Sequence, residues 1–213
     1  MIRALSSLLA AGLAALSLAG PAIAQQPFTE LSPPLATDAP GKIEVIEFFW
    51  YECPHCYELE PVLEKWVAKL PKDVEFRRVP ATFNERWNLS ARVFYALESM
   101  GLLAKLHKPL FDAIHKDRLR VTDDRQLTDW LQRQGVDIAK FQAAYRSFAV
   151  ESKLKRTQAL VAQSKIDGVP ALLIDGRYLV AAGGTVGTHE RMVAIADGLI
   201  EQSRKSMAAA GKK

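Results

Sequence analysis

A pair of cysteines separated by two residues, in the motif Cys53-Pro54-His55-Cys56, places the strongest constraint on this chain. The motif follows residues 43–50, a nearly continuous run of apolar, β-branched and aromatic side chains that is typical of a strand buried on both faces. It precedes residues 57–70, whose apolar side chains recur at helical spacing, and a second strand-like run follows at 74–79. The sequence therefore predicts a β–α–β unit with the cysteines where the first strand ends and the helix begins.

This position predicts different chemistry for the two thiols. Cys53 is expected at the helix N-cap and Pro54 at the first helical position, where a missing N–H does no harm. An N-cap side chain accepts hydrogen bonds from the next backbone N–H groups, here those of His55 and Cys56, and the helix dipole favours a thiolate. A protonated His55 would add to this effect. We therefore expect a lowered pKa for Cys53, whereas Cys56, facing the sheet, is expected to be the resolving thiol.

Cysteine pairs of this spacing also occur at zinc and haem sites. Zinc needs four ligands and normally two such pairs, and the remaining histidines form no ligand spacing with this pair. Haem attachment requires a histidine directly after the second cysteine, where this chain has Tyr57. The motif therefore favours a redox pair, with no metal and no bound cofactor. The other histidines are His107, His115 and His189.

The N-terminus indicates export. Arg3 precedes an apolar run at 4–20, and Ala22-Ile23-Ala24 offers a small-x-small cleavage site, so residues 1–24 are expected to be a cleaved signal peptide rather than a membrane anchor. Exported proteins usually use cysteines as structural staples, but this chain has 2, placed so close that a bridge between them constrains the unfolded chain little. Cysteine usage thus favours chemistry over stability.

The remaining sequence divides into three parts. Residues 25–40 are rich in proline and predict an extended arm. Residues 82–166 predict four or five helices and no strands, with an N-cap at Thr122-Asp123-Asp124 and a kink or break at Pro109. A net charge of +4 from dispersed side chains gives no reason to expect a nucleic-acid partner.

Strand character returns near the C-terminus. Two β-type runs at 171–174 and 177–180 flank Asp175-Gly176, which predicts a hairpin. A last helix is expected from about Thr188 to Arg204.

The chain resembles the DsbA family of thioredoxin-fold oxidants in two motifs. One is Cys53-Pro54-His55-Cys56 after a buried strand, and the other is Val169-Pro170 immediately before the late hairpin. Glu47, six residues before Cys53, matches the buried acid of thioredoxin-like proteins, and Pro61 matches their helix-kinking proline. The resemblance covers essentially the whole chain after the signal peptide.

The resemblance implies an α/β protein, a thioredoxin fold with an inserted all-helical domain. It also implies that Val169-Pro170 is a cis peptide that contacts the substrate backbone, and that Glu47 is a buried acid that accepts or relays the Cys56 proton. For Glu60 and Arg78 two interpretations stay open: they tune the site, or they are solvated helix and strand-end charges, which is the commoner case for such residues. The expected boundaries are 1–24 for the signal peptide, 25–40 for the arm, 41–81 with 167–205 for the thioredoxin domain, 82–166 for the helical insert and 206–213 for a flexible tail.

The implied function is donation of the Cys53–Cys56 disulfide to folding exported proteins in the periplasm. By resemblance, a quinone-linked membrane oxidase of the DsbB type restores the disulfide, and the protein is expected to be a monomer. One rival is an isomerase or reductase of the DsbC or DsbG kind. Only about 16 residues precede the first strand, which leaves no room for the extra domain of those dimers, and Val169 stands where they tend to have Thr. A second rival is a chaperone-like binding module with vestigial redox chemistry.

Overall fold

The computed structural model of the protein describes residues 26–210, so the expected signal peptide at 1–24 and the end of the expected tail, residues 211–213, lie outside the described part. Within residues 26–210, no helix is both long and apolar enough to cross a membrane.

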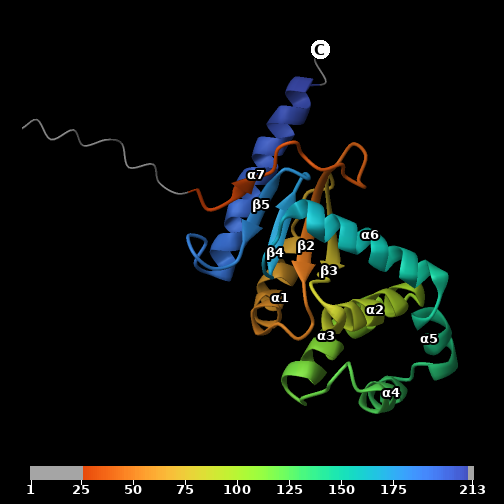
Figure 1. Cartoon of the computed structure of the whole chain (residues 1–213). Helices are drawn as coiled ribbons and strands as arrows, with labels where there is room; N and C mark the ends of the chain where they lie inside the picture. Colours follow the sequence, from red (N-terminus) through yellow and green to blue (C-terminus); the bar gives the residue numbers. More distant parts are fainter. Residues whose placement is uncertain (1–25, 211–213) are drawn as a thin grey trace, which may run out of the picture.

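A five-stranded mixed sheet forms the centre of the fold, in the order β1-β5-β4-β2-β3 (Figure 1). β2 pairs in parallel with β3 and antiparallel with β4, and β5 pairs antiparallel with both β4 and β1. The helix α1 connects the parallel pair, so the predicted β–α–β unit is confirmed. The strands are β1 (Thr29–Glu30), β2 (Ile43–Phe49), β3 (Val74–Pro80), β4 (Ala171–Ile174) and β5 (Tyr178–Ala181).

β2 is buried along its whole length, as its apolar sequence predicts. Alternate side chains point to opposite faces, so Ile43 and Val45 pack with α1 and α7, whereas Ile46 and Phe48 pack with α6. Glu47 shares a face with Ile43 and Val45, and its carboxyl is therefore directed toward α1. These helices are α1 (Pro54–Val67), α6 (Phe148–Ser164) and α7 (His189–Ala210).

The segment between β3 and β4 contains five helices and no strand, as predicted. Figure 1 shows α2 to α5 gathered beside one end of the sheet, with α6 leading back to it. The predicted N-cap at Asp123 is confirmed, because its side chain accepts a hydrogen bond from the Gln126 N–H. Pro109 does not divide a helix, since α3 continues through it. The other helices are α2 (Glu85–Ser99), α3 (Leu103–His115), α4 (Asp124–Arg133) and α5 (Ile138–Tyr145).

Both ends of the described chain are more ordered than the sequence predicts. Within the expected arm, β1 adds an edge strand to the sheet, and the arm continues across the hairpin turn, where the Leu35 N–H donates to the Gly176 carbonyl at 2.8 Å. A Cβ at Gly176 would lie 2.2 Å from the Leu35 carbonyl oxygen, so only glycine allows this close approach. At the other end α7 runs to Ala210 and not to Arg204, so the expected helix end was wrong.

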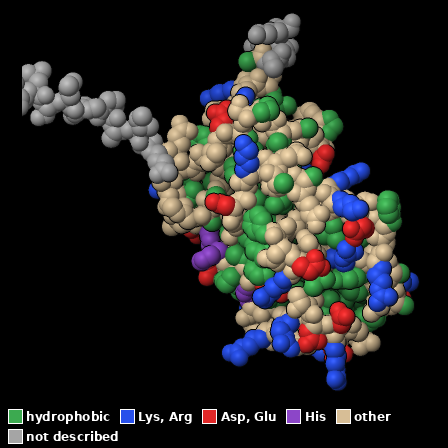
Figure 2. Space-filling view, viewed as in Figure 1, with side chains coloured by type: hydrophobic (Ala, Val, Ile, Leu, Met, Phe, Trp, Pro, Cys, Tyr) green, Lys and Arg blue, Asp and Glu red, His purple; other side chains and the backbone are tan. Residues whose placement is uncertain are grey.

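The helical segment and the cysteine pair share one apolar core. Cys53 and Cys56 pack in the same cluster as Phe49 and Tyr51 at the end of β2 and as Phe111 of α3. The motif therefore lies where the sheet meets the helical segment. On the surface, Lys and Arg side chains are interspersed with Asp and Glu over the visible face (Figure 2).

Candidate active site

Cys53 lies at the N-cap of α1 with extended backbone (φ −82°, ψ 117°), and Pro54 begins the helix, as predicted. Both cysteines are free thiols in this structure. The expected cap hydrogen bond to the Cys53 side chain is absent; the Sγ–H instead points to the Val169 carbonyl oxygen at 3.5 Å. The difference follows from protonation, because a thiol donates to a carbonyl whereas a thiolate would accept from the helix N–H groups.

The pKa of Cys53 is lowered from 9.0 to about 6. A hydrogen bond from the Cys56 thiol is the main cause, burial opposes it, and the backbone N–H groups of Cys56 and His55 and then the His55 charge add to it. The predicted direction is confirmed, but its main cause is the partner thiol. His55 is 71% exposed and lies 3.2 Å from Glu58, which limits the effect of its charge on Cys53.

Cys56 has the opposite character. It is fully buried, and its pKa lies well above the ordinary value because of burial first, and then because of Cys53 and the Glu47 carboxyl. A buried thiol that resists ionisation is a poor nucleophile toward external partners. The pair thus combines one thiol that ionises near neutrality with one that does not.

The Val169-Pro170 peptide is cis and lies beside Cys53, as the resemblance implies. Val169 also lines a cavity of about 270 Å³, together with His55, Val186 and Met192. The cavity forms a groove near Cys53, because the carbonyl oxygen of Val169, one of its lining residues, lies 3.5 Å from Cys53 Sγ. Among the described residues, no group of three metal-ligating side chains is present.

Glu47 is completely buried, as expected, and burial raises its pKa to about 8 against the opposing charge of Arg78. The Arg78 Nε lies 3.1 Å from Glu47 Oε2, but neither oxygen of Glu47 has a hydrogen-bond partner in the described structure. The two observations agree if the contact is electrostatic only, because the same Nε–H is aimed at Glu60. A buried carboxyl group without hydrogen bonds favours its protonated form.

Of the two interpretations that the sequence left open for Glu60 and Arg78, that of solvated charges does not hold. Glu60 is 3% exposed on the sheet-facing side of α1, where Arg78 donates to both of its oxygens at 3.2 and 3.1 Å. The Arg78 side chain is also mostly buried. His107 of α3 also contacts Glu60, at 3.2 Å, and a contact between such distant segments cannot be read from local sequence.

The family model for the DSBA-like thioredoxin domain matches residues 78–191. The thiol:disulfide interchange protein DsbA of Azotobacter vinelandii is 42% identical over 179 residues, which cover 84% of this chain and 83% of that protein. The chain belongs to the DsbA family. Its activity is thiol–disulfide oxidoreduction, and substrate proteins are its partners in exchange.

Solved DsbA structures share the fold. The crystal structure of Pseudomonas aeruginosa DsbA is 41% identical with a TM-score of 0.80, covering 88% of this chain and 95% of that one. Reduced DsbA1 from Neisseria meningitidis is 28% identical with a TM-score of 0.75, covering 88% of this chain and 97% of that one. The predicted α/β thioredoxin fold is therefore confirmed.

Sequence reasoning missed two histidines of α3 that reach the active-site segment. Tyr51 OH hydrogen-bonds His107 Nδ1 at 2.8 Å, and His115 Nε2 donates to the Tyr51 carbonyl oxygen, also at 2.8 Å. The His115 ring stacks on Tyr57 with centroids 4.5 Å apart. Both histidines lie on one face of an amphipathic helix, which was the only local signal. Their partners are far away in sequence, so no pattern could identify them.

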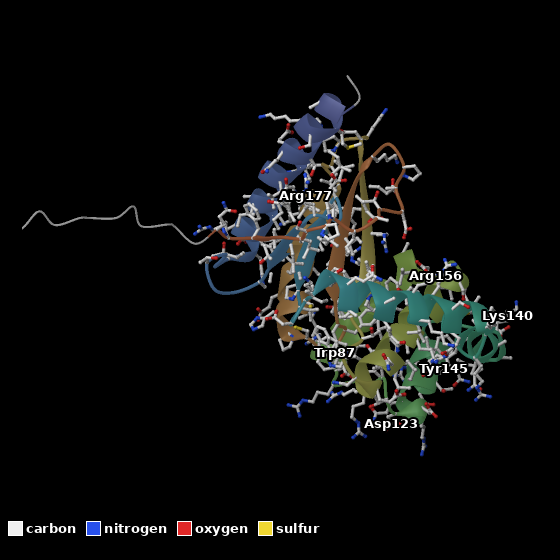
Figure 3. All side chains as sticks on the ribbon, turned by 45° about the horizontal axis from the view of Figure 1, so that its top comes forward. Trp87, Asp123, Lys140, Tyr145, Arg156 and Arg177 are labelled. Atoms are coloured by element: carbon white, nitrogen blue, oxygen red, sulfur yellow. The ribbon has the colours of Figure 1, made fainter. Side chains whose placement is uncertain are left out.

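A stacked tryptophan pair was also missed. Trp50, which precedes the motif, stacks on Trp87 of α2 with ring centroids 4.2 Å apart. Arg86 lies over the Trp50 ring and pairs with Glu52 at 2.6 Å. Figure 3 labels Trp87 close to the end of the sheet at which α1 begins. Through these contacts, α2 packs against the residues that connect the end of β2 to the cysteine motif.

The difference between the two thiols predicts selective alkylation. In the reduced DsbA-family chain, brief iodoacetamide treatment should label Cys53 with a midpoint near pH 6 and leave Cys56 unlabelled, because only the Cys53 thiolate forms in this range. Mass mapping of the labelled peptides measures this. The control is Cys56→Ala, which removes the main stabilising hydrogen bond and should move the Cys53 midpoint to higher pH. Labelling mainly at Cys56 would overturn the assignment.

Proposed function

We propose that the chain is an oxidant that donates the Cys53–Cys56 disulfide to exported proteins as they fold. The observation that carries this proposal is the unequal placement of the two thiols, Cys53 at the helix N-cap and Cys56 fully buried, which lowers the pKa of Cys53 and raises that of Cys56. A low-pKa thiolate stabilises the reduced form of the pair, and a pair that is stable when reduced tends to oxidise its partner.

The exchange proceeds in two steps. A client thiolate attacks the Cys53 sulfur and forms a mixed disulfide, while the Cys53–Cys56 bond breaks and Cys56 leaves. The buried Cys56 thiolate then takes a proton, which we assign to the neighbouring Glu47 carboxyl. The second client thiolate attacks the client sulfur of the mixed disulfide, and Cys53 leaves as a stable thiolate, which makes this step fast.

Client binding is assigned to the Val169-Pro170 loop and the groove beside it. The Val169 carbonyl faces Cys53, so an extended client segment could place its cysteine at that sulfur while its backbone pairs with the loop. Apolar walls at Val186 and Met192 suit unfolded chains of varied sequence. We assign Pro54 and His55 a tuning role, Pro54 as the first residue of the helix and His55 through its charge.

We also propose a cellular compartment, a reoxidising partner and an oligomeric state. We place the protein in the periplasm, supported by the signal-like segment at 1–24 and by the family. We assign reoxidation to a DsbB-type membrane oxidase linked to quinone, with no cofactor bound to this chain, and we expect a monomer. Such a partner would approach the Cys53 sulfur, the more accessible of the two, and the groove that also binds the client.

The oxidant proposal predicts that the reduced form is more stable than the oxidised form. The pKa of Cys53 is lower in the folded state, so the thiolate stabilises the folded reduced protein fully above the unfolded value, and this contribution is lost as pH falls through about 6. At pH 7 it is worth about 1 kcal/mol, allowing for solvent screening at a partly open thiol. That corresponds to about 20 mV in the potential.

Urea unfolding with and without reductant tests this prediction. The midpoint of the reduced form should exceed that of the oxidised form at pH 7, and the difference should shrink toward pH 5. The matched control is Cys53→Ser with and without reductant, which should show no difference. An oxidised form that is the more stable one at pH 7 would contradict the oxidant proposal and favour a reductase.

A further inference from the structure

His107 connects two buried groups that lie beneath the active site. It is 6% exposed, and its ring contacts Tyr51 OH through Nδ1 at 2.8 Å and Glu60 Oε1 through Nε2 at 3.2 Å. Glu60 is a hydrogen-bond acceptor when ionised, so Nε2 carries the proton and Nδ1 accepts from the Tyr51 hydroxyl. Both ring nitrogens are therefore satisfied by a neutral imidazole in one tautomer.

The His107–Glu60 contact makes the two buried carboxyl groups differ in the number of hydrogen bonds that they accept. Glu60 accepts three hydrogen bonds, one from His107 and two from Arg78. Glu47 is near the same guanidinium but accepts no hydrogen bond in the described structure. A buried carboxylate is stabilised by the hydrogen bonds that it accepts, whereas a buried carboxyl group without them retains its proton. One cation cannot fully compensate two buried anions, so one of the two sites holds a proton.

We propose that His107 is a positioning residue that decides which carboxyl group holds this proton. Its Nε2–H keeps Glu60 as the carboxylate, and the proton is left on Glu47, the acid beside Cys56. The inference rests on the functions proposed above for Cys56 and Glu47, and it adds a residue from α3 that touches neither sulfur.

The electrostatics agree with this arrangement. Burial alone would raise the pKa of Glu60, but the His107 hydrogen bond and the Arg78 charge outweigh it and hold the value below the ordinary one. Burial raises the pKa of Glu47 to about 8. Burial also lowers the pKa of His107 and so keeps the ring neutral. The hydrogen bond with Glu60 raises this pKa, but burial outweighs it. The titratable and charged groups around His107 come from six elements or segments: Tyr51 before α1, Glu60 and Glu64 on α1, Glu47 on β2, Arg77 and Arg78 on β3, Glu98 on α2, and Lys108 on α3.

The arrangement supplies a proton where the reaction needs one. When a client thiolate breaks the Cys53–Cys56 bond, the bonding electrons stay on Cys56, and the proton of Glu47 can pass to that sulfur. Glu47 is then an anion beside Arg78. During reoxidation the Cys56 proton returns to Glu47 as the disulfide forms. If Glu60 held the proton instead, Cys56 would face a carboxylate that cannot donate.

The test compares His107→Leu, His107→Gln and His115→Leu. Leucine removes both hydrogen bonds of His107, whereas glutamine keeps a donor for Glu60 and an acceptor for Tyr51. His115→Leu is the matched control, because it removes the other α3 side-chain hydrogen bond to Tyr51 without contacting either carboxyl group. The readout is the rate constant for reduction of the oxidised protein by dithiothreitol, expressed per thiolate, as a function of pH.

In the wild type this rate should decline as Glu47 loses its proton near pH 8. In His107→Leu the decline should shift down by about one pH unit. Glu60 without the His107 hydrogen bond is a weaker partner for Arg78, so Arg78 stabilises the Glu47 carboxylate more and lowers the pKa of Glu47. His107→Gln and His115→Leu should keep the wild-type profile, although His115→Leu is expected to lose stability. Coincident profiles for His107→Leu and the wild type would overturn the inference. A wild-type protein that dithiothreitol does not reduce would instead refute the proposed function.

The unmodified protein gives a second measurement in case His107→Leu does not fold. Carboxyl ¹³C chemical shifts of glutamate in the reduced wild type, assigned with Glu47→Gln and Glu60→Gln, report which group is protonated. Glu60 should remain ionised from pH 5 to pH 8, and Glu47 should titrate near 8. A protonated Glu60 beside an ionised Glu47 at pH 7 would contradict the inference.

Discussion

Replacing Cys53 with serine is expected to lower the rate of client oxidation by more than about a thousandfold. The client thiolate attacks this sulfur because it is the more accessible one and because it leaves again as a stable thiolate. Serine can neither form the disulfide nor accept the mixed disulfide. The measurement is the loss of free thiols from a reduced, unfolded protein with two cysteines, followed by mass spectrometry.

Cys56→Ser is the matched control, because it also removes the disulfide but retains the reactive thiol. It should accumulate mixed disulfides through Cys53 that non-reducing gels resolve and that disappear with reductant. Cys53→Ser should give none. Equal accumulation in both variants would contradict the assigned functions of the two cysteines.

The same variant separates the oxidant from the chaperone-like alternative. A binding module would suppress aggregation of a cysteine-free client equally well before and after Cys53→Ser. An oxidant would lose its activity toward a client that has cysteines. The binding module would be favoured by two results together: Cys53→Ser still suppresses aggregation, and the wild-type protein does not oxidise the client that has cysteines.

The fold was predictable wherever short-range sequence determines the structure. The apolar run of β2, the helical spacing after Cys56 and the Asp175-Gly176 turn each depend on neighbours within a few residues. The cysteine motif was equally local, because N-cap position and proline at the first turn follow from chain order. Backbone geometry at Asp175 and Gly176, with φ of 53° and 62°, agrees with the turn that this dipeptide favours.

The parts that sequence reasoning missed depend on distant contacts. β1 is two residues long and becomes a strand only because the edge of β5 is available to pair with it. Glu60 carries the same local signal as an exposed helix glutamate, but it is buried and contacts Arg78 of β3 and His107 of α3, both distant in sequence. The low pKa of Cys53 was predicted, but its main cause, the Cys56 thiol, requires the spatial relation of the two sulfurs.

Arg78→Leu is expected to lower the free energy of unfolding by about 3–5 kcal/mol at pH 7, because it leaves the ionised Glu60 carboxylate buried without a cation. Urea unfolding of the reduced protein measures this. Arg204→Leu is the matched control, since Arg204 pairs with Asp73 on the surface and its loss should cost little. A loss for Arg78→Leu no greater than for the control would show that the buried carboxyl groups do not depend on this guanidinium.

The same comparison at low pH tests the cause of the loss. In the wild type the pKa of Glu60 is lowered, so its contribution is present above the unfolded value of about 4.3 and is lost as pH falls through the folded value. In Arg78→Leu the pKa of Glu60 should lie above the unfolded value, so the penalty is present above about 4.3 and vanishes below it. Both effects bring the unfolding free energies of the wild type and of Arg78→Leu closer together in acid. The difference in unfolding free energy should therefore narrow from pH 7 to pH 4, whereas a constant difference would indicate lost packing by the arginine stem instead of lost charge.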